Sequence, residues 1–237
     1  MLGFYIDVII VGQAGHTHQS LDEHLRQFYK KSERGDTDDG PSVGFSHFAS
    51  HELGSSKIVD LPFDGHGPVW ILQIDAHIDW RDEVHGSRYG YSSPMRRASE
   101  MPHVAGMVQV GLRSVGSARV EEVEAAQAYG SRFVTARQVH AEGVEAALRH
   151  IPQGANVVIT LDCDGLDPAI MPGVAARTPG GLNYTQVIDL IAGVGQRGRI
   201  AGFDIVELYP PADVDGLSAL TAARLVVNAI GTIVRQE

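Results

Sequence analysis

Two short acidic runs contain the side chains of this chain that are best suited to chemistry. They are residues 75–79 and 162–164, and they hold Asp75, His77, Asp79, Asp162 and Asp164. Carboxylate oxygens and an imidazole nitrogen are ligands of divalent cations. Four acids placed together would repel one another unless cations lay between them. The composition of the two runs therefore predicts a hydrolytic site with two metal ions.

Each acidic run follows an apolar stretch that is typical of a buried strand, residues 69–74 in one case and 156–161 in the other. Alternate residues of an extended chain share a face. The three metal-type residues of the first run are therefore expected to point one way, and the two aspartates of the second run are expected to share a side.

The rest of the chain alternates between strand and helix patterns from about residue 69. The expected strands are 69–74, 107–110, 132–135, 156–161 and 200–206, and the expected helices are 118–129, 136–150, 185–194 and 218–234. This alternation predicts an α/β fold with a mostly parallel sheet that is covered on both sides. Ligands of such sheets bind at the carboxyl ends of the strands, where both acidic runs fall.

Length and composition restrict the possible partners. The 237 residues are enough for one domain, and the formal charge of −10 argues against nucleic acid and suits a cationic substrate. We expect no apolar run to reach transmembrane length, and the N-terminus lacks a basic region, so we expect no membrane partner and a cytoplasmic location. The single Cys163 excludes an internal disulfide.

The N-terminal part follows a different pattern. Residues 31–56 are polar, rich in Gly, Ser and Asp, and include His47 and His51. A loop of this length is unusual inside a compact domain. We therefore expect one domain over residues 1–237, in which residues 1–64 are an atypical segment.

Several motifs, in the right order, resemble the ureohydrolase family of arginases, agmatinases and guanidino-acid hydrolases. Residues 75–79 (Asp-Ala-His-Ile-Asp) resemble the second metal motif of that family, and residues 162–168 (Asp-Cys-Asp-Gly-Leu-Asp-Pro) resemble the third. Residues 202–207 resemble the strand with the acid that meets the guanidinium group, and residues 91–98 resemble the substrate loop of agmatinases. The resemblance covers roughly residues 65–235 and favours an agmatinase or guanidino-acid hydrolase over an arginase.

The resemblance implies an arginase-like three-layer α/β/α sandwich with two Mn²⁺ ions per chain. It implies hydrolysis of a guanidino compound, such as agmatine or a guanidino acid, to urea and an amine by a hydroxide that bridges the metals. It also implies a homo-oligomer, either a trimer or a hexamer. The physical chemistry agrees, because cations supply hydroxide at neutral pH and a carboxylate can accept parallel hydrogen bonds from a guanidinium group.

Residue roles follow from the same resemblance. Asp75 and Asp162 would bridge both metals, His77 and Asp164 would complete one site, and Asp79 would belong to the other. Glu207 would bind the substrate guanidinium, and the catalytic set would be Asp75, Asp162 and Glu207. Ser92 and Ser93 would also bind substrate.

The chain departs from the family at the first metal motif, Gly-Gly-Asp-His, which has no full match upstream of Asp75. His51 has a tolerable spacing but lacks the glycines and the preceding strand. Three explanations stay open. His51 is a displaced ligand, the first metal is held only by Asp79 and the bridging acids, or the N-terminal part is aberrant and one metal site is crippled. The last two are favoured over the first.

A second departure concerns the proton shuttle, which many family members supply as a histidine after the second motif. That region holds Ser92 and Ser93 here, and His85 is the nearest histidine. The alternative to an enzyme is therefore a non-catalytic or defective ureohydrolase-like protein that binds metal or partner subunits. A deacetylase-like site with a single zinc suits these acidic motifs less well.

Overall fold

The computed structural model describes the backbone of residues 6–11 and all of residues 67–236. The predictions for most of the segment 1–64, including those for His47 and His51, lie outside the described residues.

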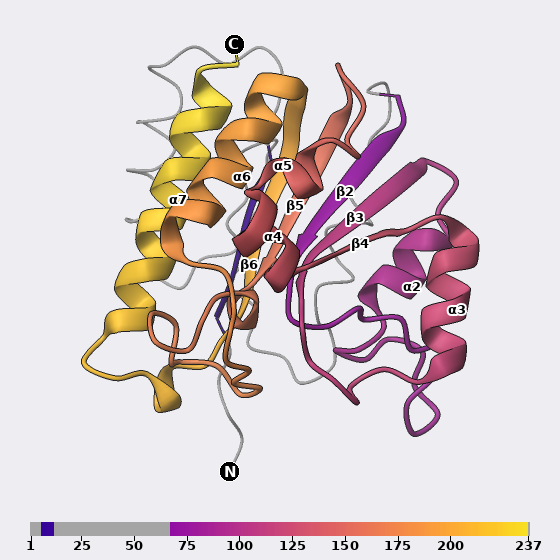
Figure 1. The fold of residues 1–237 in the computed structure, drawn as a ribbon, viewed down its shortest axis with the longest axis horizontal. Helices are drawn as coiled ribbons and strands as arrows, with labels where there is room; N and C mark the ends of the chain where they lie inside the picture. Colours follow the sequence, from indigo (N-terminus) through magenta and orange to yellow (C-terminus); the bar gives the residue numbers. More distant parts are fainter. Residues whose placement is uncertain (1–5, 12–66, 237) are drawn as a thin grey trace, which may run out of the picture.

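A six-stranded sheet forms the centre of the described fold (Figure 1). Its strands are β1 (Ile6–Val11), β2 (Val69–Ile74), β3 (Val104–Leu112), β4 (Arg132–Thr135), β5 (Asn156–Asp162) and β6 (Arg199–Leu208). The strand order is β1-β6-β5-β2-β3-β4, and only β1 runs antiparallel to its neighbour, β6. The predicted mostly parallel sheet is thus confirmed, with β3 and β6 longer than expected.

The helices differ from prediction in two places. They are α2 (Pro94–Ser99), α3 (Val120–Tyr129), α4 (Ala136–Glu142), α5 (Glu145–Leu148), α6 (Tyr184–Arg197) and α7 (Leu217–Val234). The single helix expected over residues 136–150 is interrupted at Gly143, whose φ of 80° ends α4. The short helix α2 was not predicted, although Pro94 at its first turn is a common start signal.

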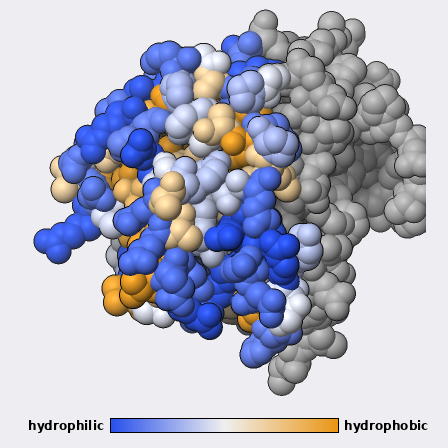
Figure 2. Space-filling model, turned by 90° about the vertical axis from the view of Figure 1, so that its right-hand side faces the viewer, coloured by the Kyte–Doolittle hydropathy of each residue, from blue (hydrophilic) through white to orange (hydrophobic). Residues whose placement is uncertain are grey.

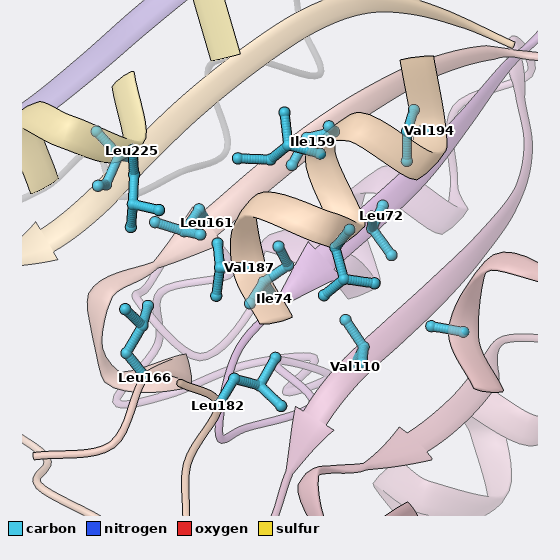
Figure 3. Close-up of a cluster of buried hydrophobic side chains, with 14 of the residues drawn as sticks. Leu72, Ile74, Val110, Ile159, Leu161, Leu166, Leu182, Val187, Val194 and Leu225 are labelled. Atoms are coloured by element: carbon cyan, nitrogen blue, oxygen red, sulfur yellow. The ribbon is translucent and has the colours of Figure 1, made fainter. Parts of the chain in front are cut away.

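Helices cover both faces of the sheet, which confirms the three-layer α/β/α architecture (Figure 1). Alternate residues of β2 pack into opposite layers. Leu72 and Ile74 join the larger cluster, which includes residues of α4 to α7, while Val69 and Ile71 join the smaller one with residues of α2 and α3. Figure 3 shows Leu72 and Ile74 of the larger cluster with residues of α6 and α7. Figure 2 shows that the outer surface on the α2 and α3 side is mostly hydrophilic.

One helix of the described part, α7, is long and apolar enough to cross a membrane by length and composition, contrary to the sequence expectation. It packs against α6 and β6, where Leu225 and Ala229 are buried. Core helices pass the same test, so no membrane assignment follows.

Candidate metal centre and active site

Three adjacent strands, β6, β5 and β2, bring the predicted site residues to one edge of the sheet. The register pairs Ile74 with Leu161 and Asp162 with Val206. The acidic runs and the end of β6 therefore lie at one level, as expected for the carboxyl ends of parallel strands.

Both runs contribute to one group of possible metal ligands, formed by Asp75, His77 and Asp164. One ligand atom from each residue lies within 4.8 Å of the others. The Nδ1 atom of His77 is 3.2 Å from Asp75 Oδ1 and 3.1 Å from Asp164 Oδ2. Two carboxylates and an imidazole at this spacing suit a divalent cation.

Asp79 and Asp162 lie beside this group. Asp79 Oδ2 accepts a hydrogen bond from Gln73 Nε2 at 3.1 Å, and Asp162 Oδ1 accepts one from the backbone N–H of Asp164 at 2.8 Å. The first run does not continue as an extended strand, because the chain bends after β2 and Asp79 has a φ of 48°. Its side chains therefore meet through a turn and not through the simple alternation expected from the sequence.

The buried carboxylates lie close enough to repel one another electrostatically. Burial, followed by the charges of Asp79 and Asp164, raises the pKa of Asp75 well above its ordinary value. Burial and nearby carboxylates also raise the pKa of Asp162, and burial raises that of Asp79 to about 6. A bound cation would offset this repulsion, so the residues present fit a metal site.

For His77 and Asp164, the interactions between the two side chains outweigh burial and favour the charged forms. Burial opposes ionisation of Asp164, but the hydrogen bond and charge of His77 bring its pKa below the ordinary value. Burial also opposes the charged form of His77, yet Asp164 raises its pKa overall. A cation bound by His77 Nδ1 would take the place of a proton on that nitrogen, because a metal-binding imidazole is neutral.

The main chain around Asp75 is tightly enclosed. A Cβ atom at Gly165 would lie 2.9 Å from the backbone nitrogen of Asp75, and one at Gly111 would lie 2.9 Å from its carbonyl oxygen. Gly111 also has a φ of 98°. The two runs are linked directly, because the N–H of Ala76 donates to Asp164 Oδ1 at 3.2 Å. Glycines thus allow the chain after β2, the end of β3 and the turn after β5 to approach closely.

A pocket of about 320 Å³ opens beside the metal-type residues. Its wall includes His77, Asp79, Asp162, Asp164 and Glu207. Tyr91, from the predicted substrate loop, also lines it, as do residues that were not predicted from the sequence, among them Trp80, Arg81, Ala118 and Glu122. Glu122 comes from α3, far along the chain, so no local pattern marked it.

Arg81 and Glu122, which both line this pocket, form a salt bridge. Arg81 Nε lies 3.8 Å from Glu122 Oε1, and Arg81 Nη2 donates to the carbonyl of Ser117 at 3.0 Å. The pocket therefore combines a carboxylate-rich wall with a salt bridge that could meet the polar tail of a ligand.

The predicted substrate residues take different positions. Glu207 and Ser92 line the pocket, and Glu207 has a left-handed φ of 61°. Ser93 is fully buried and is absent from the pocket wall, and its Oγ makes no hydrogen bond within the described residues. His85 is exposed and also lies outside this wall.

Comparisons with known proteins identify relatives of this chain. The sequence model of the Arginase family matches residues 50–231. The chain is 35% identical over 192 residues to an N(1)-aminopropylagmatine ureohydrolase of Thermus thermophilus, covering 80% of this chain and 61% of that protein. It is 31% identical to a guanidinobutyrase of Pseudomonas aeruginosa, covering 75% and 58% of the two chains.

Solved structures show the same relationship. Proclavaminate amidino hydrolase from Streptomyces clavuligerus matches with a TM-score of 0.68 and 28% identity, over 77% of this chain and 61% of the other. Agmatine ureohydrolase of Thermoplasma volcanium matches with a TM-score of 0.64 and 30% identity, over 76% and 60%. The chain spans about three fifths of the length of these relatives. With the family model matching most of its residues, the chain belongs to the arginase family.

Proposed function

We propose that the protein hydrolyses the guanidino group of a small cationic substrate, giving urea and an amine. One observation carries the proposal: the convergent group of Asp75, His77 and Asp164 lies beside a pocket that Glu207 also lines. Relatives named as ureohydrolases and a guanidinobutyrase support this reaction class.

The proposed cofactor is Mn²⁺, with two ions per chain. Asp75 and Asp162 would contribute to both sites, His77 and Asp164 would complete one of them, and Asp79 would belong to the other. Bound divalent cations would lower the pKa of a water molecule and so supply hydroxide at neutral pH.

The side chains of the pocket would bind and orient the substrate. The carboxylate of Glu207 can accept parallel hydrogen bonds from a planar guanidinium group and so hold its carbon beside the metal ligands. The apolar surfaces of Ile78, Trp80 and Ala118 line the same pocket and would limit the access of bulk water.

The tail of the substrate would lie towards the Arg81–Glu122 pair. Glu122 would favour an amine, as in agmatine, while Arg81 would favour a carboxylate, as in a guanidino acid. Ser92 would contact the substrate, whereas Ser93 is buried and does not line the pocket. An agmatinase or guanidino-acid hydrolase stays our proposal for the finer specificity.

Urea release tests the proposal directly. The purified protein would be incubated with Mn²⁺ and then with agmatine, arginine, 4-guanidinobutyrate or N(1)-aminopropylagmatine. We expect urea from at least one of them, and none from the Asp162→Asn variant. A folded, manganese-loaded protein that releases no urea from any of the four would contradict the proposal.

The alternative is a non-catalytic relative that binds metal or partner subunits. The observation that favours it is that the convergent group in the described residues contains three ligands, enough for one cation, while the first metal motif has no full match. Metal analysis separates the two: two manganese ions per chain favour the enzyme, and one or none favours the alternative.

The remaining proposals rest on the family resemblance and composition. We propose a cytoplasmic homo-oligomer, a trimer or a hexamer, that binds neither nucleic acid nor membrane. Light scattering after size-exclusion chromatography would give the oligomeric state, and a monomer would contradict this part of the proposal.

A further inference from the structure

Two glutamines lie in the apolar layer beneath α2 and α3. Gln73 of β2 and Gln109 of β3 are register partners, and their side chains are 2% and 0% exposed. Two residues earlier on the same strands, Ile71 and Met107 belong to the apolar cluster of that layer. A buried primary amide is costly unless its donors and acceptor are paired.

Gln109 is fixed by three partners. Its Nε2 atom donates to Gln73 Oε1 at 2.5 Å and to the backbone carbonyl of Ile78 at 2.7 Å. Its Oε1 atom accepts a hydrogen bond from Ser131 Oγ at 2.7 Å. Both hydrogens of the Gln109 amide therefore have acceptors. One of these acceptors is the carbonyl of the peptide bond between Ile78 and Asp79.

Gln73 extends this hydrogen-bond network to the acidic run at residues 75–79. Its Oε1 atom accepts from Gln109, and its Nε2 atom donates to Asp75 Oδ2 at 2.6 Å and to Asp79 Oδ2 at 3.1 Å. A flipped Gln73 amide would place its oxygen against two carboxylates and its NH₂ group against the Gln109 donor. The direction of the whole chain of hydrogen bonds is thus determined.

We propose that Ser131, Gln109 and Gln73, here called the amide chain, are positioning residues for the metal ligands Asp75 and Asp79. Gln73 engages the Oδ2 atoms of both aspartates, so that Asp75 Oδ1 faces His77 Nδ1. The inference rests on the proposed metal site. Groups that orient metal ligands commonly contribute to metal affinity without touching the metal.

A purely structural role is the competing explanation, because two buried amides could pair only to satisfy each other within the sheet. The two roles differ in what a substitution changes. A structural pair affects the stability of the metal-free protein, whereas a positioning pair also affects metal affinity in a protein that stays folded.

The test is Mn²⁺ titration of the chelator-treated, metal-free protein, by calorimetry and by electron paramagnetic resonance. Gln73→Met removes the donors to both aspartates, and we expect the Mn²⁺ Kd to rise by about 10- to 100-fold. Gln109→Met should give a smaller rise and Ser131→Ala the smallest, because they act through Gln73.

Tyr129→Phe is the matched control. It removes a hydrogen bond, from Tyr129 Oη to the carbonyl of Val104 at 3.2 Å, in the same layer but at the start of β3. We expect it to leave the Mn²⁺ Kd unchanged. Tm in the presence of chelator, recorded for every variant, separates loss of stability from loss of affinity.

Three further outcomes test the positioning role. If Gln73→Met lowers Tm but binds Mn²⁺ as tightly as the unmodified protein, the positioning role is overturned. If the unmodified protein binds no Mn²⁺, the proposed metal site fails and the inference fails with it. If Gln73→Met does not fold, the graded effects of Gln109→Met and Ser131→Ala against Tyr129→Phe decide.

A double substitution adds a sharper readout. In an Asp79→Asn background, Gln73→Met should raise the Kd by a smaller factor than it does alone, because part of its effect passes through Asp79. Equal factors in the two backgrounds would overturn the route through Asp79.

Discussion

The two acidic runs differ in the groups that hold them in place. After β2, a buried side-chain amide supports the carboxylates, since Gln73 donates to Asp75 and Asp79 in addition to the N–H of His77, which donates to Asp75 Oδ1. After β5, the main chain holds them, since the N–H of Asp164 donates to Asp162 within a short turn (η2, Cys163–Gly165).

Arg113 reinforces the second run from outside. Its guanidinium group donates to the carbonyl oxygens of Asp164, Gly165, Leu166 and Thr178. The geometry of the second run is thus part of the backbone fold, whereas that of the first depends in addition on a buried side-chain amide. Changes to the groups that support the first run should therefore affect cation binding more than stability, and changes around Arg113 should affect stability more than cation binding.

The largest expected effect is the loss of metal binding and activity when a carboxylate of the second run is removed. Asp162→Asn should abolish metal retention and lower urea release by roughly 1000-fold or more, because metal catalysis contributes several kcal/mol to transition-state stabilisation. Metal analysis and urea assays measure both effects, and circular dichroism checks that the fold survives. Full activity in this variant would refute the proposed role of Asp162.

Next in size is the loss of the Arg113 contacts. Arg113→Met should lower the free energy of unfolding by about 3 kcal/mol, because several carbonyl groups lose a charged donor. Arg177→Met is the matched control, since the exposed Arg177 also donates to carbonyls, those of Pro172 and Ala212. Denaturant unfolding should show less than about 1 kcal/mol for the control. Equal losses would contradict the special role of Arg113.

Metal binding should stabilise the protein by a similar amount. At a Mn²⁺ concentration of 100 times the Kd, the free energy of unfolding should rise by about 2.7 kcal/mol, and chelation should reverse the gain. Asp162→Asn should show no such gain. Thermal unfolding with and without Mn²⁺ measures the difference, and an Asp162→Asn gain equal to that of the unmodified protein would contradict a site that spans both runs.

The smallest effect concerns the loop that follows the second run. Burial opposes ionisation of Asp167, but the N–H groups of Ala169, Gly180 and Gly181 lower its pKa below the ordinary value. The ionised form thus contributes stability above the unfolded pKa of about 3.9, and this contribution is lost as pH falls through the folded pKa.

Asp167→Asn should therefore cost about 1 kcal/mol at pH 7, because charge-assisted hydrogen bonds are lost. The difference from the unmodified protein should shrink in acid. Denaturant unfolding at a series of pH values measures it, and a difference that stays constant down to acid pH would contradict the role of the charge.

The strands and the acidic runs could be predicted because both are local patterns. Apolar stretches that end in Asp75 and in Asp162 mark strand ends, and parallel strands bring such ends together. The arginase-like fold and family followed from the motifs at these ends and are confirmed.

The features that could not be predicted from the sequence depend on contacts between segments that are far apart in the chain. The amide chain requires that β2 and β3 be neighbours with Gln73 opposite Gln109. Glu122 reaches the pocket only because α3 packs beside the first run. The burial of Ser93 follows from α2, a helix too short for a periodic signal.

Asp79 and Glu207 share one feature, a left-handed backbone in residues other than glycine. Both line the pocket, and such conformations cost of order 1 kcal/mol or more each. Glycine would relieve that strain at either position and would remove the carboxylate as well. Laboratory evolution that rewards heat resistance alone is thus expected to erase these acids early, so a stabilised library of this protein should be selected for turnover at the same time.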